Sequence, residues 1–402
     1  MDALFASHWT WLAIGVLAVM AVFGLVQWLG GTRRAERPDP NRDFVIESLL
    51  ALVGGDDGRS EHLLAQAIEE GRSDPRIFLA YGAHLTRRGE AGRAARLFEG
   101  LLARGGLEPP IARYTHEALV EALVRGGRSE QAQAWAQRLA EPAHLDAERL
   151  ERRARLALAA RAYEVAEALA ARLERVRRDQ GRRILALCYA AQAEDKVDQG
   201  QRDEASRLLR KALARDRETA AVWALDGQLL LEDGKLDKAR AAFFEAIKRE
   251  AGLGIAVFPE LEDAHIEAGQ VADFEAMIHE LLEVRPHDPV ALWALGSHLV
   301  RRRHLRDGIT TLNEAVEWAP GFALARRELD RARAELEGRP EPIDNEPTDS
   351  GTRCTACGTN GVHGIVRCPV CGHVGTIVFI GVPAAPVVTL LPSQPPAEAT
   401  TP

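Results

Sequence analysis

The 402-residue sequence lacks the short motifs that mark the common classes of enzyme. It contains no GxxxxGK[ST] phosphate loop, no GxSxG nucleophile elbow and no HExxH zinc motif. The stretch AGLGIAVF at 251–258 has two glycines but not the third one of a dinucleotide-binding loop. The twelve histidines are scattered along the chain. We therefore expect a protein that binds other molecules and is not an enzyme.

Aromatic residues and cysteines are also scarce, and this scarcity narrows the class of protein further. Only 5% of the residues are aromatic and five are cysteine, whereas 46% are hydrophobic, with alanine and leucine dominant. Such a composition favours an all-α fold. The net charge of -8 argues against a general nucleic-acid binder, because affinity for phosphate backbones comes from clustered cations. The cysteines are too few and too clustered for a secreted disulfide framework.

Charged residues are missing altogether from Trp9 to Leu29, WTWLAIGVLAVMAVFGLVQWL. As a helix this run would span about 30 Å, the thickness of a hydrocarbon core. Trp11 and Trp28 lie near its ends, where aromatic rings favour the membrane interface. A cleaved signal peptide is the alternative, but the run is long for one, no basic residue precedes it and no clear cleavage site follows. The sequence predicts a single transmembrane helix at 9–29.

Arginines follow this run at once, at 33, 34 and 37. Because positive charge stays on the cytoplasmic side, residues 1–8 should be periplasmic and the remaining chain cytoplasmic, beginning with a basic linker at 30–40. We expect a single-pass membrane protein whose body lies in the cytoplasm.

A repeat occupies the next part of the chain. The stretches 74–102 and 219–247 match residue for residue at a mid-helix glycine, a helix-ending glycine, an alanine and a phenylalanine. These matches are Gly82 with Gly227, Gly89 with Gly234, Ala94 with Ala239, and Phe98 with Phe243. The pattern recurs every 34 to 39 residues or so, which is typical of tetratricopeptide repeats. An irregular helical bundle is the alternative, but one period shared by the mid-helix glycine, the helix-ending glycine and the alanine favours a right-handed solenoid. We expect about eight repeats and a capping helix over 41–337.

Beyond the repeats the composition changes twice. Residues 338–352 are acidic and proline-rich, which predicts a solvated linker, and the proline-rich tail at 382–402 is expected to be disordered. Between them, residues 353–381 hold four of the five cysteines as two CxxC pairs, ten residues apart: Cys354, Cys357, Cys368 and Cys371.

Two CxxC pairs in a reducing compartment predict a metal site, not disulfides. Four thiolates suit a closed tetrahedral zinc site, and iron is the alternative because rubredoxin sites use the same paired loops. Gly358 and Gly372 follow each pair, where positive φ lets backbone N–H groups face the sulfurs. Arg353 and Arg367 adjoin the first cysteines and are expected to offset the thiolate charge.

Three further residues could in principle be reactive or bind a metal, but their surroundings favour other roles. Cys188 lies alone in the apolar stretch RRILALCYAAQ, where a small buried side chain is expected. His363 and His373 lie among the cysteines and are expected to be solvated, with a role as spare ligands as the alternative.

An apolar anchor, a tetratricopeptide solenoid and a C-terminal RCTACG…CPVCG…GTI ribbon together resemble the lipopolysaccharide assembly protein B family. The stretch DFVIESLLAL at 43–52 also looks like the first repeat of that family. The resemblance implies an adaptor in the inner membrane that regulates lipopolysaccharide synthesis. It would work with a membrane-bound ATP-dependent protease, which degrades the deacetylase that commits carbon to lipid A. The resemblance also implies metal ligation by the four ribbon cysteines, a ribbon that packs against the solenoid, and other lipopolysaccharide assembly proteins as partners; a homo-oligomer is compatible with it.

Two other functions are considered beside this adaptor. One is a general scaffold for envelope-complex assembly with a purely structural ribbon. The other is a nucleic-acid-binding ribbon tethered to a solenoid, which has only Arg353 and Arg367 and no stacking aromatic residue in its favour.

Overall fold

The computed structural model describes residues 40–71, 73–140, 145–340, 351–361, 364–379 and 381. The predicted transmembrane segment at 9–29, the residues on either side of it up to 39, His363 and the tail from 382 lie outside this described part. No helix within the described ranges has both the length and the apolar composition that a membrane crossing needs.

The chain divides into two compact units, residues 1–84 and residues 85–402. The first unit contains α2 (Pro40–Val53), α3 (Asp57–Glu69) and most of α4 (Pro75–Arg87). The Asp56 carboxylate caps α3 by accepting from the Arg59 N–H. Leu64 and Ala67 of α3 pack with Ile77 of α4 in a small core that Phe44 of α2 also contacts.

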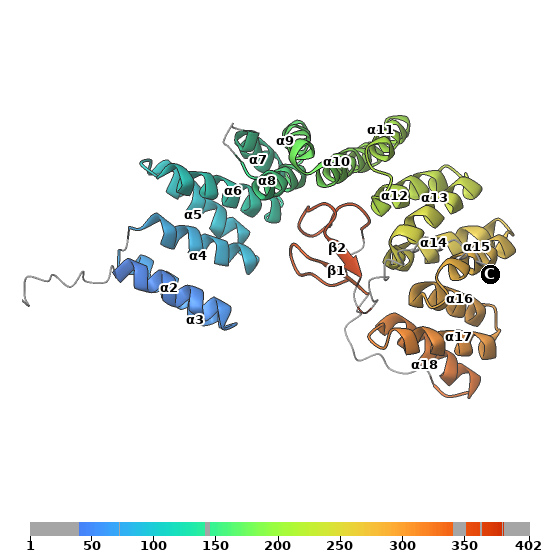
Figure 1. Ribbon diagram of the computed structural model, residues 1–402. Coiled ribbons are helices and arrows are strands. Elements are labelled where there is room, and N and C mark those ends of the chain that lie inside the picture. Colours follow the sequence, from blue (N-terminus) through green and yellow to red (C-terminus); the bar gives the residue numbers. More distant parts are fainter. Residues whose placement is uncertain are drawn as a thin grey trace, which may run out of the picture. The chain divides into compact units, whose positions relative to one another are not determined.

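The second unit is a row of helices followed by a small ribbon (Figure 1). Its helices after α4 are α5 (Ala91–Ala103), α6 (Pro109–Arg125), α7 (Ser129–Ala136), the 3-10 helix η1 (Gln137–Ala140), α8 (Ala147–Ala159), α9 (Tyr163–Val176), α10 (Arg178–Asp198), α11 (Arg202–Arg215), α12 (Ala220–Glu232), α13 (Leu236–Arg249), the 3-10 helix η2 (Ala251–Leu253), α14 (Gly254–Glu267), α15 (Val271–Val284), α16 (Pro289–Arg301), α17 (Leu305–Trp318) and α18 (Ala323–Leu336). Two short antiparallel strands, β1 (Thr352–Cys354) and β2 (Ile377–Phe379), pair in the ribbon. The prediction of an all-α repeat fold is confirmed for the described residues.

The same turn joins the two helices of every pair. The residue two positions before each second helix has positive φ, and the next N–H bonds back to the carbonyl five residues earlier, as at Glu90 to Leu85. Within the described residues this turn residue recurs every 34 to 39 positions: Gly55, Gly89, Gly127, Arg161, Gly200, Gly234, Gly269 and Arg303. The same local turn therefore follows the first helix of each of these pairs.

Mid-helix glycines let the paired helices approach. A Cβ added at Gly227 would lie 2.6 Å from the Phe243 ring, and one at Gly296 would lie 2.7 Å from Leu312. Both contacts are shorter than van der Waals packing allows, so a larger residue at either position would hold the two helices apart.

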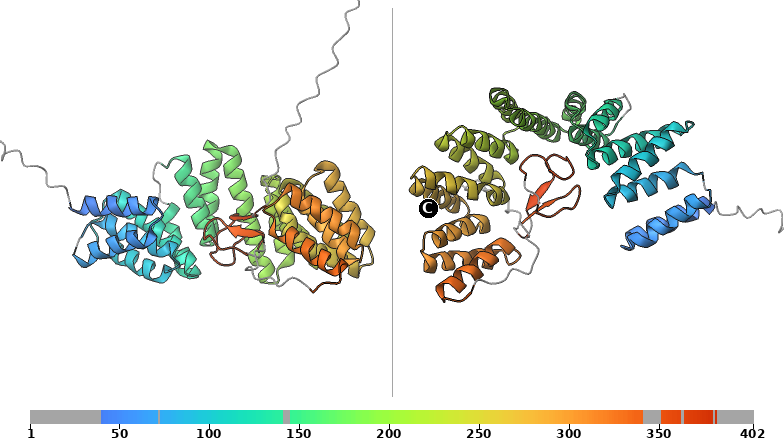
Figure 2. Two further views of the ribbon diagram at one scale, coloured as in Figure 1. Left: turned by 90° about the horizontal axis from the view of Figure 1, so that it is seen from below. Right: turned by 180° about the vertical axis from the view of Figure 1, so that it is seen from behind.

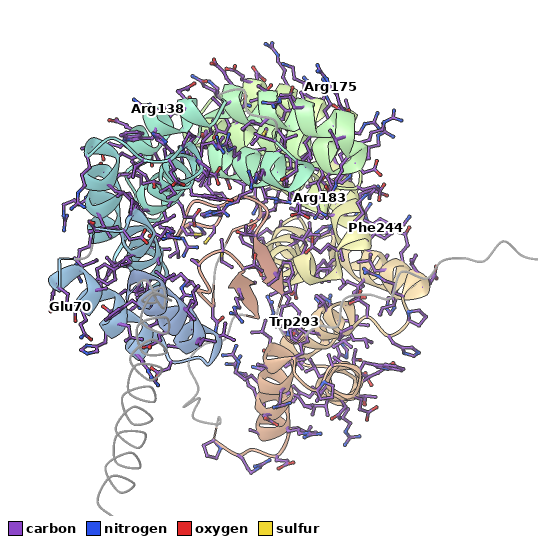
Figure 3. All side chains as sticks on the ribbon, turned by 60° about the vertical axis from the view of Figure 1, so that its left-hand side comes forward. Glu70, Arg138, Arg175, Arg183, Phe244 and Trp293 are labelled. Carbon is purple, nitrogen blue, oxygen red and sulfur yellow. The ribbon has the colours of Figure 1, made fainter. Side chains whose placement is uncertain are left out.

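The strands lie on the inner side of the curve that α6 to α18 form (Figures 1 and 2). Side chains of the second unit fill much of the space between the ribbon and the helices (Figure 3). The inner surface of the repeats therefore meets the cysteine-containing segment directly.

Candidate metal centre

Each CxxC pair forms a tight loop closed by its glycine. The Gly358 N–H donates to the Cys354 carbonyl at 2.8 Å, and the Gly372 N–H donates to the Cys368 carbonyl at 2.9 Å. The φ angles of these glycines are 76° and 71°, in the left-handed region that residues with a Cβ seldom occupy. The prediction of positive φ at both positions is confirmed.

The two loops bring all four predicted ligands together. The four Sγ atoms lie within 4.8 Å of one another, with 3.6 Å between Cys354 and Cys371 and 3.9 Å between Cys357 and Cys368. A tetrahedral ion with metal–sulfur bonds of about 2.3 Å requires sulfur–sulfur distances of about 3.8 Å, whereas a disulfide requires about 2.0 Å. The donor set and its spacing fit a tetrahedral metal ion. Four thiolates at these distances serve zinc and iron equally well, so the geometry does not select one metal.

Hydrogen bonds from the loops support negative charge on the sulfurs. Burial opposes ionisation of Cys357, but the hydroxyl and the backbone N–H of Thr359 lower the pKa of this thiol to about 6. Backbone N–H groups also reach Cys368 and Cys371, although burial keeps the pKa of both thiols above its usual range. The expected orientation of backbone N–H groups toward the sulfurs is thus found. One metal cation at the centre would supply the positive charge that offsets the negative charge of these partly buried thiolates.

Arg367 makes contacts with the repeats that the sequence did not suggest. Its guanidinium donates to the Tyr163 hydroxyl at 3.1 Å and to the Gly372 carbonyl at 2.9 Å, and it lies 3.5 Å from the Glu194 carboxylate. Tyr163 and Glu194 belong to α9 and α10, so this arginine ties the second CxxC loop to the repeats. Burial raises the pKa of Glu194, although the charge of Arg367 opposes that rise.

His373 is not solvated, and the expectation from the sequence is wrong on this point. Its side chain is 12% exposed, and its Nε2 lies 3.1 Å from the Glu121 carboxylate of α6. Burial disfavours the charged form of Glu121, but hydrogen bonds from His373 and then Arg125 outweigh burial and lower its pKa to about 2. Arg125 also donates to the Ala356 carbonyl in the first CxxC loop. Both loops are therefore fastened to α6.

Phe379 of β2 forms the apolar part of the contact. Its side chain packs against a buried cluster that includes Leu253, and it covers Gly252 so closely that a Cβ there would lie 2.2 Å from the ring. A glycine at 252 is thus explained by the docking of Phe379. No pattern in the sequence pairs these two residues, which are more than a hundred positions apart.

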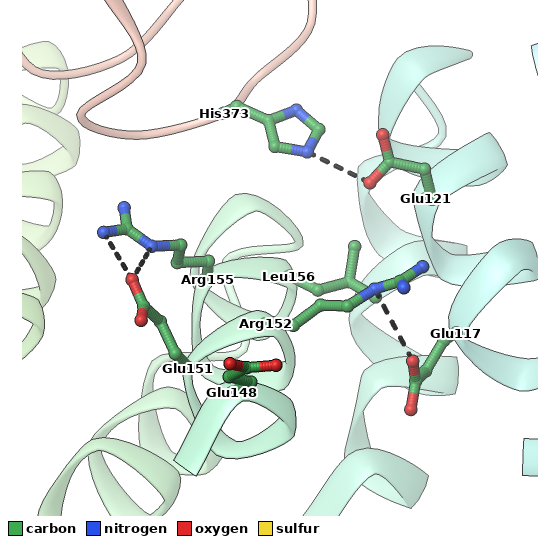
Figure 4. A pocket seen from close by; sticks show the side chains of 8 residues that line it. All are labelled: Glu117, Glu121, Glu148, Glu151, Arg152, Arg155, Leu156 and His373. Atoms are coloured by element: carbon green, nitrogen blue, oxygen red, sulfur yellow. Dashed lines mark hydrogen bonds and ion pairs between the residues drawn. The ribbon is translucent and has the colours of Figure 1, made fainter. Parts of the chain in front are cut away.

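A cavity of about 350 Å³ opens beside His373, between the ribbon, α6 and α8 (Figure 4). Its lining contains both acidic and basic residues. Arg152 lies 3.7 Å from the Glu117 carboxylate, and Arg155 lies 2.9 Å from the Glu151 carboxylate. The residues that line it are Glu117, Glu121, Glu148, Glu151, Arg152, Arg155, Leu156 and His373. The three basic residues of this lining are thus each paired with one of its glutamates.

Cys188 of α10 is fully buried, as expected. Burial raises the pKa of this thiol well above its usual range, so it behaves as a small hydrophobic side chain and not as a nucleophile.

Comparisons with known proteins add little beyond this geometry. No protein-family model and no curated protein matches the sequence. A tetratricopeptide repeat protein from Parabacteroides merdae is similar at 13% identity and a TM-score of 0.34, over 73% of this chain and 98% of that one. A chain of the APC/C hetero-tetramer Cut9–Hcn1 is similar at 13% identity and a TM-score of 0.30, over 76% of this chain. The present chain spans 58% of the length of that second protein. The repeat assignment rests on the turns and helix pairs of the chain itself.

Proposed function

We propose that this protein is an inner-membrane adaptor that regulates lipopolysaccharide synthesis. It promotes turnover of the deacetylase that commits carbon to lipid A, by presenting that enzyme to a membrane-bound ATP-dependent protease. The proposal starts from the family resemblance of the sequence. The observation that carries it further is the cysteine ribbon seated on the inner side of the repeats, held there by Arg367, His373 and Phe379.

A binding role suits this site better than catalysis. A metal held by all four cysteines has no open position for a substrate, so it acts as a structural cross-link. The ribbon contacts α6, α9, α10 and the η2 segment, which belong to different repeats. The metal thereby stabilises the relative positions of several repeats, and with them the surface that a partner would meet.

The half-life of the deacetylase tests the proposal. Depletion of the protein should lengthen this half-life and raise lipopolysaccharide output, and Cys368→Ser should do the same because it breaks the ribbon. Cys188→Ala is the matched control, since it removes a buried cysteine outside the ribbon. An unchanged half-life in both the depleted and the Cys368→Ser cells would overturn the adaptor role.

A general scaffold for envelope-complex assembly is the second candidate. The row of helix pairs favours it, because stacked repeats offer a long binding surface whatever the client. Co-purification from membranes separates the two: the adaptor brings down the protease and the deacetylase, whereas the scaffold brings down other envelope proteins. Nucleic-acid binding by the ribbon is the weakest candidate, because Arg367 is already bound to Glu194 and Tyr163.

A further inference from the structure

An apolar stripe runs along the outer face of α2 in the first unit. Ile46, Leu49, Leu50 and Val53 are 45%, 50%, 65% and 88% exposed. Their spacing of three, four and seven residues places them on one face of the helix, over about 10 Å of its length. The other exposed large apolar residues of the described chain are scattered singly, such as Val176 and Val284. Single residues of that kind are ordinary, but an aligned set of four marks a contact surface.

The opposite face of α2 is already in use. Phe44 and Val45 pack against the core of Leu64, Ala67 and Ile77, and Ser48 is buried with its hydroxyl donating to the Val45 carbonyl. The helix is thus apolar on both sides, although it begins a solenoid whose end should be polar if water covered it. Something other than water must cover the outer stripe.

We infer that the outer stripe of α2 docks on the lipid surface of the membrane, in the interface beneath the headgroups. This inference rests on the anchoring of the chain at 9–29 that the proposed function includes. Only residues 30–39 separate that segment from α2, and ten residues reach at most about 35 Å. The stripe is therefore held close to the bilayer. Arg33, Arg34 and Arg37 lie in the same connection, where they complement anionic headgroups.

Two other occupants fit less well. A segment that spans the bilayer at 9–29 is committed to lipid along its length and is not free to cover α2. A second copy of the chain would meet only four side chains along about 10 Å, which falls short of the roughly 1,200 Å² that a stable interface buries. A second, interfacial contact beside a spanning helix would instead orient the first repeat on the membrane.

Photo-crosslinking identifies the occupant in the full-length protein. A benzophenone amino acid is placed at position 50 or 53, and the protein is reconstituted in vesicles of phosphatidylethanolamine and phosphatidylglycerol. We expect lipid adducts at both positions. The same probe at position 284, an exposed valine in a later repeat, is the control and should give none. Adducts to residues 9–29, adducts to a second copy, or no lipid adduct would each overturn the inference.

A double substitution gives an independent check. Leu49→Gln with Leu50→Gln should remove most of the lipid adduct at position 53, while the matched pair Val176→Gln with Val284→Gln should leave it unchanged. Metal content and circular dichroism confirm that the variants fold. Resistance of the protein to alkaline extraction from the vesicles reports on the anchor alone. If the protein resists extraction but forms no lipid adduct, the anchor is supported and the contact of α2 with lipid is contradicted. If the protein is extracted, the anchor itself is contradicted.

Discussion

His298 of α16 is fully buried between two carboxylates. Its Nδ1 lies 2.8 Å from Glu262 of α14, and its Nε2 lies 2.9 Å from Glu275 of α15. An imidazole donates from both nitrogens only when it is protonated, so this position favours the charged ring. Burial lowers the pKa of His298, but the two carboxylates outweigh burial and raise it above its usual value. Arg301 adds a second cation at 3.0 Å from Glu262.

This arrangement predicts a pH-dependent stability. The pKa of His298 is higher in the folded protein than in the unfolded chain. The stability that the charged ring adds to the fold is therefore fully present below about pH 6.5, and it is lost as the pH rises through the folded pKa. His298→Gln should lower the free energy of unfolding by about 2 kcal/mol at acidic pH, because a glutamine amide cannot replace both charge-assisted bonds. The difference between the two proteins should shrink toward alkaline pH. Urea unfolding across this range measures it.

The control for this prediction is His287→Gln. His287 is exposed and lies 3.6 Å from Glu314, so its loss should change stability by less than about 1 kcal/mol at any pH. Equal pH slopes for the wild type and His298→Gln would show that the buried ring is not charged.

Gly252 is the residue that should decide how firmly the ribbon is docked. The methyl group of an alanine at this position would overlap the Phe379 ring. It should destabilise the contact between the ribbon and the repeats by about 1–3 kcal/mol. We expect Gly252→Ala to speed hydrogen exchange across 364–379 while the metal stays bound, because the cysteines are untouched. Gly100→Ala is the control, since nothing lies within 4 Å of a Cβ there.

The compensating pair tests the same contact from the other side. Removing the ring in Gly252→Ala/Phe379→Ala should make the glycine substitution nearly neutral relative to Phe379→Ala alone. Additive effects of the two substitutions would show that the ring and the glycine do not meet.

At the scale of elements, the ribbon should depend on a bound metal ion more than on an apolar core. It has two three-residue strands and a small cluster made mainly of its cysteines. Cys357→Ser should therefore abolish metal binding and unfold 351–381, while the solenoid keeps its helices because repeats contact mainly their neighbours. Elemental analysis and circular dichroism of the purified protein measure the two effects. Cys188→Ala should retain about one metal ion per chain. Wild-type protein that carries no metal when purified under reducing conditions would contradict the site.

The elements also show which features a sequence can reveal. The repeat was predictable because its helix-ending glycines recur at one period, and only the turn geometry demands them. Arg161 and Arg303 hold the same left-handed turn without glycine, so the glycine pattern alone does not mark those two turns. The cysteine loops are local and were predicted from spacing. The partners Tyr163, Glu194 and Glu121 were not, because they lie on helix faces up to about 250 residues away and carry no local pattern.

At the scale of the whole molecule, the proposed adaptor combines three separate roles. In that proposal the anchor at 9–29 sets the location, the repeats and the ribbon set what is bound, and the protease supplies the chemistry. Holding client and protease on one membrane surface raises their effective concentration and contributes nothing to the cleavage step. Each role should therefore be separable by a different change in the chain.

Removing residues 1–29 should separate location from binding. The truncated protein should keep its metal and its helices and should still bind the deacetylase weakly, but it should no longer shorten the half-life of that enzyme in cells. Replacing 9–29 by an unrelated single-span segment of the same orientation should restore turnover, because tethering needs only a helix of sufficient length. A truncated protein that still promotes turnover would show that the anchor is dispensable. A replacement segment that fails, in a protein that is membrane-bound and metal-loaded, would show that the native segment makes specific contacts within the bilayer and does more than tether.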